Sequence, residues 1–349
     1  MLKTRKYHLL RLLSFLLSTV LLSCCTAKLA TPIGGADDHD KMRQAEPISE
    51  SRLMLDTFCT ITIYDSLDQS IIKEALDLCE EYEGLFSISA EGGDVWRINH
   101  AGGAPVTVSQ QTAEVIRAGI EYAELSGGMF DITIGRLSTL WDFSGQSGVP
   151  TEPEIADARA TVDYRQVSIS GNTVLLANPE AWIDLGGIAK GYIADRAAGF
   201  LRDRGVAGAV IDLGGNIVVV GRKTDGKPWR VGVTKPFSER SDLIGVVETG
   251  EASVVSAGVY ERQFMEDGVL YHHILDPKTG MPVRSDVIGA TVVSEGSMEG
   301  DALSTTILLL GSSGAAVVLD ESPGFIGAVM ILDNGEILQY GNVEFQAIS

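Results

Sequence analysis

Two segments of this chain have the same five residues, IDLGG, at positions 183–187 and 211–215. Paired glycines permit backbone conformations that are closed to other residues. The first copy precedes a stretch, residues 188–205, whose apolar residues recur at helical spacing, so its glycines would lie at a helix N-terminus. Free N–H groups and the helix dipole attract anions there, and Lys190 would add a positive charge one turn into the helix. The first copy therefore predicts an anion-binding turn, with a capped structural turn as the alternative.

The second copy continues into a strand-like segment, NIVVVGRK, rather than into a helix. For Asp212 this favours a structural role in a turn at the end of a strand. Neither copy has the spacing of a dinucleotide-binding GxGxxG or of a P-loop, so neither predicts a Rossmann or Walker site.

A later segment, EGDALSTTILLLG, places a carboxylate and two hydroxyls at helical spacing. Asp301, Ser304 and Thr305 stand at i, i+3 and i+4, which puts three oxygens on one face of the helix. The apolar residues of the segment would face largely inward. Oxygen ligands of this kind suit a hard cation such as Mg²⁺, which recruits substrate phosphates. The alternative is a capped amphipathic helix without a metal.

Two of the five histidines in the chain are adjacent, in YHHILDPKTGMP. In an extended segment, His272 and His273 would point to opposite faces, so only one of them can face a given site. The following residues, 276–280, are typical of a turn that a proline presets and a glycine closes. A histidine beside a phosphoryl centre could act as the base for an attacking hydroxyl, although a structural role is equally compatible with the pattern.

Composition limits the partners of the protein. The formal net charge is −20, and removing residues 1–23 would take away four positive charges and no negative ones, leaving −24. This excess argues against nucleic acid or anionic lipid headgroups as partners. A phosphate-bearing ligand would need a metal ion or local dipoles to bind. Four cysteines without a CxxC spacing indicate neither a disulfide framework nor a zinc site.

The N-terminus has basic residues, a short apolar run and then Leu-Leu-Ser-Cys, the order of a lipoprotein signal. We expect residues 1–23 to be a signal peptide and Cys24 to become lipidated, with plain cleavage or an uncleaved anchor as the alternatives. Residues 24–50 lack apolar periodicity and predict a flexible, lipid-anchored tether. Residues 51–349 would form the folded body outside the cytoplasm, on a bacterial cell membrane.

The body alternates helices with hairpins. Residues 55–65 predict a strand; 66–87 and 109–128 predict helices, the second capped at Ser109 or Gln110. Residues 144–160 read as a loop, and RQVSISGNTVLLA reads as a hairpin with its turn at Gly171 and Asn172. Helices mixed with antiparallel hairpins favour an α+β fold with mixed or antiparallel sheets in a single large domain.

Seven segments together resemble the ApbE family of FAD:protein FMN transferases: LDTFCTI, GGMFDITIGRLSTLWDF, IDLGGIAKGY, IDLGGN, SAGVYERQF, HHILDPKTGMP and GDALSTTILLLG. They occur in the family's order, from about residue 52 to the C-terminus. The resemblance implies an Mg²⁺-dependent enzyme with an ApbE-like fold. Such an enzyme joins FMN from FAD, through its phosphate, to a threonine or serine of a partner flavoprotein and releases AMP. The expected acceptor is an extracytoplasmic subunit of a redox complex.

The resemblance also assigns roles by position. It implies a backbone oxygen of Gly187 with Asp301, Ser304 and Thr305 as metal ligands, and His273 with Asp301 as catalytic residues. The implied FAD contacts are Leu55, Ser89, Met129, Phe130, Asp131, Asp184, Lys190 and Leu275.

Two other functions use the same features. An Mg²⁺-dependent FAD pyrophosphatase would replace the protein hydroxyl by water and yield free FMN and AMP. A flavin-binding lipoprotein without catalysis would leave FAD intact, and it would leave the face of Asp301, Ser304 and Thr305 unexplained.

Overall fold

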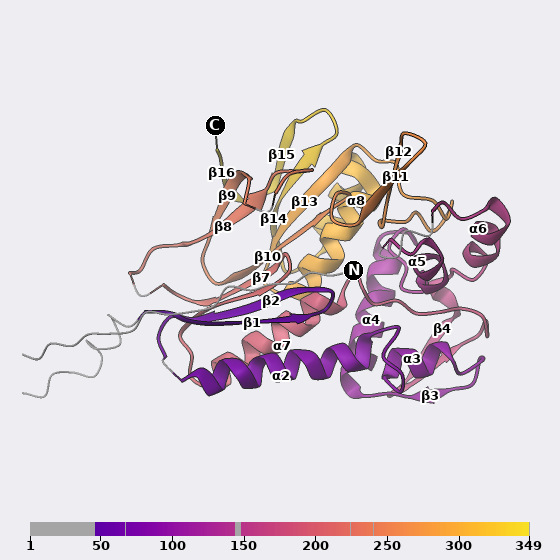
Figure 1. Cartoon of the computed structure of the whole chain (residues 1–349), viewed down its shortest axis with the longest axis horizontal. Coiled ribbons are helices and arrows are strands. Elements are labelled where there is room, and N and C mark those ends of the chain that lie inside the picture. Colours follow the sequence, from indigo (N-terminus) through magenta and orange to yellow (C-terminus); the bar gives the residue numbers. More distant parts are fainter. Residues whose placement is uncertain (1–45, 67, 144–147, 224, 240, 349) are drawn as a thin grey trace, which may run out of the picture. The chain divides into compact units, whose positions relative to one another are not determined.

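The computed structural model describes residues 46–349 except 67, 144–147, 224, 240 and 349. The predicted signal peptide, the lipidation site at Cys24 and the tether up to residue 45 lie outside the described residues. The described chain folds around an eight-stranded antiparallel sheet (Figure 1). Its strands, in spatial order, are β1 (Ile48–Met54), β2 (Thr57–Ile63), β6 (Gly208–Leu213), β7 (Asn216–Gly221), β10 (Ala252–Gly258), β13 (Val287–Ser294), β14 (Phe325–Leu332) and β15 (Ile337–Gly341).

One face of this sheet is covered by long helices (Figure 1). The α7 helix (Ala189–Asp203) packs on β6 and β7, and α8 (Ser297–Glu321) packs on β10 and β13. The α2 helix (Gln69–Phe86) lies against α7 and the β1–β2 hairpin. The apolar stripe of each helix meets the apolar side chains of the strands, and this contact forms the main core.

A smaller antiparallel sheet packs apolar side chains against the main sheet in a second core. It consists of β8 (Trp229–Thr234), β9 (Leu243–Thr249) and β16 (Glu344–Ala347), with β9 in the middle. Because both faces of β13 are covered, nearly every residue of that strand is buried. The sandwich gives the site helices a rigid base.

The remaining elements form smaller units. A three-stranded sheet has the order β3 (Val106–Thr107), β5 (Thr173–Leu176) and β4 (Val167–Ser170). The β11 (Gln263–Glu266) and β12 (Val269–His272) strands form a hairpin of their own. The other helices are α3 (Asp94–Asn99), α4 (Gln110–Leu125), α5 (Gly135–Trp141), α6 (Glu152–Arg159) and the 3₁₀ turn η1 (Tyr164–Gln166).

The predicted α+β class is confirmed, and so are the helices predicted over 66–87, 109–128 and 188–205, as α2, α4 and α7. The Ser109 hydroxyl caps α4 by accepting a hydrogen bond from the Thr112 N–H. The hairpin with Gly171 at its turn is confirmed as β4–β5.

Two predicted boundaries differ from the structure. Residues 144–160 were expected to be loop, but Glu152–Arg159 is helix α6, which begins with a capping box between Thr151 and Glu154. The body also begins earlier than residue 51, because strand β1 starts at Ile48 and pairs with Ile63. The last three residues of the expected tether therefore belong to the sheet.

The α8 helix is long and apolar enough to cross a membrane by length and composition. It also has non-helical backbone angles at Gly311, with φ of 72°. The Asp286 carboxylate accepts a hydrogen bond from the Ser312 N–H at this break. Because α8 packs against β10, β13 and α7, it is a core helix of this fold, in which the site segment forms the first half.

Candidate active site

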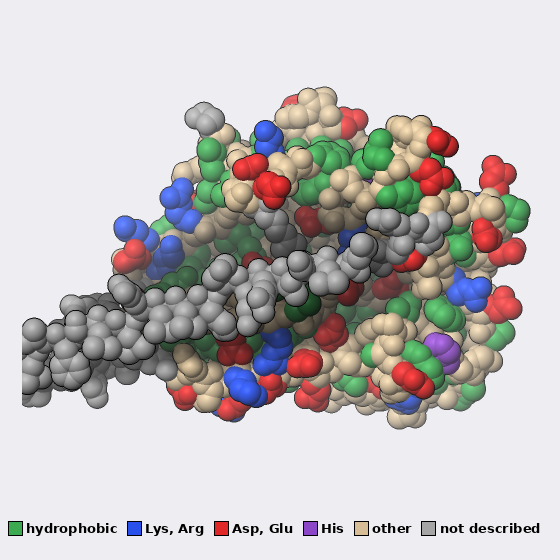
Figure 2. All heavy atoms as spheres, in the orientation of Figure 1, with side chains coloured by type: hydrophobic (Ala, Val, Ile, Leu, Met, Phe, Trp, Pro, Cys, Tyr) green, Lys and Arg blue, Asp and Glu red, His purple; other side chains and the backbone are tan. Residues whose placement is uncertain are grey.

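A cavity of about 1130 Å³ opens where the helical face meets the turns of the main sheet. Its walls come from segments that are far apart in the sequence: the β1–β2 turn, the end of α2, residues 129–143, the first IDLGG, the β6–β7 turn, the end of β10, the segment after β12, and α8. Acidic side chains are spread over the face of the molecule shown in Figure 2 and are not gathered in one patch. The cavity is of the size that holds a large cofactor-like ligand.

The first turns of α7 and α8 meet at one end of this cavity. The Gly191 N–H donates to Asp301 Oδ2 over 2.9 Å. The Asp195 carboxylate, one turn further along α7, accepts hydrogen bonds from the N–H groups of Ser297 and Met298, which are free groups at the start of α8. These contacts fix the position of Asp301 relative to the first IDLGG.

Asp301 and Thr305 both line the cavity, and Gly187 lies beside them. A Cβ added to Gly187 would lie 3.7 Å from Thr305 Oγ1 and 3.0 Å from Phe130 Cε2, so a side chain at this position would crowd the Phe130 ring. Burial raises the pKa of the Asp301 carboxyl, while the positive charge of Lys190 and the Gly191 N–H act in the opposite direction. A buried carboxylate of this kind needs a compensating partner.

Ser304 is placed differently from the expectation. Its side chain is fully buried, it does not line the cavity, and its hydroxyl donates to the Asp301 carbonyl oxygen over 2.9 Å. The apolar residues of this segment face inward, as expected: Ala302, Leu303 and Ile307 are fully buried. Asp301 and Ser304 are buried as well, because α8 is covered on several sides.

Hydrogen bonds from two other segments, at Asn99 and Ser138, hold the first IDLGG in place. The buried Asn99 side chain donates to the Ile183 carbonyl oxygen and accepts from the Ile183 N–H, at 2.9 and 2.7 Å. Asp184 Oδ1 accepts from the Gly186 N–H, and Asp184 Oδ2 accepts from the Ser138 hydroxyl at 2.6 Å. The turn leads into α7, as predicted. Lys190, in the first turn of that helix, lines the cavity.

The second IDLGG is the turn between β6 and β7. Asp212 Oδ1 accepts hydrogen bonds from the N–H groups of Gly214 and Gly215, at 2.9 and 3.1 Å. Gly214 has φ of 68°, and a Cβ there would lie 2.4 Å from the Thr57 side chain. This carboxylate therefore caps the turn, as predicted, while Gly214 itself lines the cavity.

The two histidines point to different surroundings, as expected. His272 is buried, and its Nε2 lies 3.2 Å from the Val283 carbonyl oxygen. His273 lines the cavity, with Nδ1 3.3 Å from the Arg262 carbonyl oxygen. A carbonyl only accepts, so Nδ1 of His273 carries the proton and Nε2 keeps its lone pair. Burial, followed by the charge of Arg262, lowers the pKa of His273 to about 3, so the ring is neutral at pH 7.

Leu55 lies in the tight turn between β1 and β2. Leu55 and Asp56 have φ of 54° and 57°, in the left-handed region that disfavours side chains other than glycine. The Leu55 N–H donates to Glu83 Oε1 over 2.8 Å, which ties the turn to α2. The strained turn holds Leu55 at the cavity wall.

Asp131 is largely satisfied by its own neighbourhood. Its carboxylate accepts hydrogen bonds from the Thr133 N–H and hydroxyl and from the Tyr164 N–H. Burial nevertheless raises the pKa of Asp131. Asp131 lines the cavity next to Phe130. Its hydrogen bonds to Thr133 and Tyr164 also stabilise the local fold.

Comparison with known proteins identifies the family of the chain. The ApbE family model matches residues 55–330. The chain belongs to the ApbE family.

Relatives named FAD:protein FMN transferase include those of Klebsiella pneumoniae and Vibrio cholerae. The Klebsiella protein is 34% identical over 295 residues, which cover 83% of this chain and 90% of that protein. The Vibrio protein is 31% identical over 284 residues, covering 80% and 85%.

Two solved structures have a similar fold. The ApbE protein from Thermotoga maritima gives a TM-score of 0.77 at 32% identity, covering 84% of this chain and 97% of that one. The flavin transferase ApbE from Vibrio cholerae gives 0.76 at 29% identity, covering 85% and 97%.

In this ApbE family member, all but one of the expected metal-binding, catalytic and FAD-binding residues lie on one cavity. Ser304 is the exception. The residues that line it are Leu55, Ser89, Met129, Phe130, Asp131, Asp184, Gly187, Lys190, His273, Leu275, Asp301 and Thr305.

Sequence reasoning missed other wall residues. Ser138 lines the cavity and holds Asp184, and Arg262 lines it beside His273. Both lie within quoted family segments, GRLSTLWDF and SAGVYERQF. Their presence in those segments was the available signal, but only the fold shows which side chain of each segment faces the cavity.

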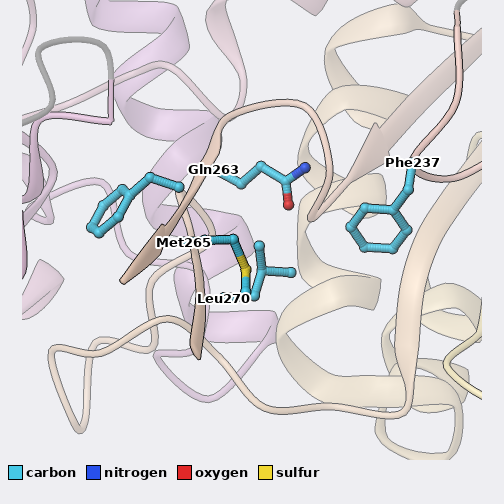
Figure 3. Close-up of a pocket in the computed structure, with 5 residues that line it drawn as sticks. Phe237, Gln263, Met265 and Leu270 are labelled. Atoms are coloured by element: carbon cyan, nitrogen blue, oxygen red, sulfur yellow. The ribbon is translucent and has the colours of Figure 1, made fainter. Parts of the chain in front are cut away.

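A second, smaller pocket of about 420 Å³ lies beside the β11–β12 hairpin. Figure 3 shows Phe237 facing Gln263, Met265 and Leu270 across it. Its lining has no acidic, basic or metal-ligating side chain apart from the thioether of Met265. The titratable side chains expected to do chemistry, such as Asp301 and His273, line the larger cavity.

Proposed function

We propose that this chain transfers FMN from FAD to a serine or threonine hydroxyl of a partner flavoprotein and releases AMP, with Mg²⁺ as cofactor. The observation that carries the proposal is the convergence of Asp301, Thr305, Gly187, Lys190 and His273 on one cavity large enough for a dinucleotide. These residues supply oxygen ligands, a phosphate-binding charge and a base.

The residues present fit a magnesium ion. Asp301 offers a buried carboxylate, Thr305 a hydroxyl, and Gly187 lies close enough to Thr305 to add a backbone oxygen. Among the described residues there is no group of three or more His, Cys, Asp or Glu side chains that could hold a metal. A mixed oxygen site that retains waters and binds substrate phosphate is the arrangement that Mg²⁺ prefers. A bound Mg²⁺ would neutralise charge that develops on the pyrophosphate oxygens.

The chain's own groups would bind and orient FAD. The backbone N–H groups at the start of α7 and the Lys190 ammonium favour the pyrophosphate at the first IDLGG. Met129, Phe130 and Leu55 offer apolar surface for a ring system on the same walls. Because the protein is strongly acidic, this local positive field is needed to hold an anionic substrate.

His273 would take the proton of the incoming hydroxyl at Nε2. The hydroxyl oxygen attacks the FMN phosphorus, a new P–O ester bond forms, and the P–O bond to AMP breaks. The imidazole is neutral before the reaction, which is the form that accepts a proton. The negative charge of a bound pyrophosphate would raise the pKa of His273 from its low value and make it a stronger base.

We also propose that the enzyme is a lipoprotein of a bacterial cell membrane, anchored at Cys24, with its catalytic domain outside the cytoplasm. The order of basic, apolar and Leu-Leu-Ser-Cys residues at the N-terminus supports this proposal. A redox-complex subunit outside the cytoplasm would then be the acceptor.

The test is to incubate the purified protein with FAD and Mg²⁺, with and without a flavoprotein subunit as acceptor, while following AMP release and flavin fluorescence of the acceptor band in a denaturing gel. AMP together with a fluorescent band is the expected result. AMP and free FMN without any band would replace the proposal by an FAD pyrophosphatase. Intact FAD would show a flavin-binding protein without this catalysis.

A further inference from the structure

Asn216, the residue that follows the second IDLGG, has a buried side chain with an unused donor. It is the first residue of β7, its side chain is 1% exposed, and its Nδ2 has no hydrogen-bond partner. A buried amide N–H without a partner costs free energy, so such a group in a native fold needs an explanation.

The strand pairing places Asn216 next to α8, the helix that carries Asp301. Asn216 pairs with Val255 across β7 and β10. Val255 in turn lies against Gly300, where an added Cβ would be 2.9 Å from Val255 Cγ2. Gly300 directly precedes Asp301, and β7 contacts both α7 and α8. The second IDLGG thus brings Asn216 to the same carboxylate that the first IDLGG segment reaches through Gly191.

The Asp301 carboxylate can accept a hydrogen bond from a second donor. Its Oδ2 accepts from the Gly191 N–H, and within the described chain no other side-chain hydrogen bond to this carboxylate is formed. The Asn216 amide is placed to act on this carboxylate as a side-chain donor, at a separation longer than a hydrogen bond. A donor at this point would restrain the orientation of the carboxylate.

We infer that Asn216 is a positioning residue for the metal site: when an ion binds, its Nδ2 moves into hydrogen-bond distance of the Asp301 oxygen that Gly191 does not hold, and so keeps the carboxylate aimed at the ion. This role rests on the metal site of the proposed function. It gives the repeated IDLGG a common purpose, since each copy delivers one donor to Asp301. Groups that orient a metal ligand typically change metal affinity by about 10- to 100-fold when they are removed.

The experiment is a titration of the purified protein with Mn²⁺, followed by electron paramagnetic resonance, in the absence of FAD and acceptor. Asn216→Ala and the isosteric Asn216→Asp should each weaken Mn²⁺ binding by about tenfold or more. The matched control is Ser253→Ala, another buried polar residue in the neighbouring strand β10, which should keep the wild-type affinity. Circular dichroism checks that each variant is folded, and Asn216→Asp serves if the alanine variant is not.

Wild-type or tighter Mn²⁺ binding by Asn216→Asp would overturn the inference. A second readout is FAD affinity without metal, measured by flavin fluorescence, which should stay within about twofold of wild type. A large loss there would show that Asn216 shapes the flavin cavity instead, and would also overturn it. Failure of the wild type to bind Mn²⁺ would remove the metal site and this inference together, whereas failure to release AMP despite Mn²⁺ binding would overturn only the proposed reaction.

Discussion

The Gly191 N–H donates to Asp301 Oδ2 over 2.9 Å, joining the first turn of α7 to the first turns of α8. The same glycine allows the two helices to approach closely. A Cβ at Gly191 would lie 2.2 Å from the Ser297 carbonyl oxygen and 2.6 Å from Met298 Cα. The helix that follows the first IDLGG and the Asp301 carboxylate therefore share one packing contact, and changes to that contact should affect stability and the proposed metal binding together.

Replacing Gly191 by alanine should therefore destabilise the protein. The new methyl group meets backbone atoms that cannot swing away, so we expect the free energy of unfolding to fall by about 2 kcal/mol or more. Gly199→Ala is the matched control, because Gly199 lies in the same helix with no atom within 4 Å of an added Cβ. That change should raise stability by about 0.5 to 1 kcal/mol. Urea denaturation measures both, and equal effects would contradict the close-packing argument.

Asp301→Asn should lower activity without lowering stability. The asparagine oxygen can still accept from the Gly191 N–H, and a buried charge is removed, so the free energy of unfolding should stay the same or rise. Loss of the charged ligand should lower AMP release by more than about 100-fold and weaken Mn²⁺ binding. Full activity in this variant would sink the assignment of Asp301 to the metal.

His273→Gln should lower kcat much more than FAD affinity. The glutamine amide can still donate to the Arg262 carbonyl, but it cannot take a proton. We expect kcat to fall by about 100-fold while the Kd for FAD changes by less than about threefold. His100→Gln, at an exposed histidine outside the cavity, is the control and should retain activity. An equal loss of turnover and affinity would make His273 a binding residue.

His272 should make the protein less stable in mild acid. Burial lowers the pKa of His272 from 6.5 to about 4, so between these values the unfolded chain binds more protons than the folded chain. Stability is therefore full above pH 6.5 and falls as the pH decreases, by about 2 kcal/mol at pH 5 from this group. His273 acts in the same direction.

The measurement is urea denaturation at pH 7.5 and pH 5, for the wild type and for His272→Gln. The variant should lose less stability between the two pH values, by about the contribution of His272. An identical pH dependence in both proteins would show that His272 does not remain neutral in the folded state.

Much of the local structure was readable from the sequence because it rests on short-range patterns. The apolar spacing of residues 188–205 predicted α7, and glycines at its start predicted the turn before it. Helix α6 was missed although Thr151 and Glu154 form its capping box, since eight residues with little apolar character give a weak periodic pattern. Strand β1 was not predicted, and the tether was expected to reach residue 50, because β1 is an edge strand in which only Met54 is buried.

By itself, the sequence determined the α+β class through its local periodicity. The order of its motifs determined the family to which the chain belongs and, through that family, twelve of the residues that line the cavity. Only the tertiary structure decided how these residues are used. Ser304 turns to its own helix because α8 is buried on several sides, and Asn216 reaches the surroundings of Asp301 only through the pairing of β7 with β10. Such contacts join positions that are dozens of residues apart, and they exist only once helices and sheet pack into one core.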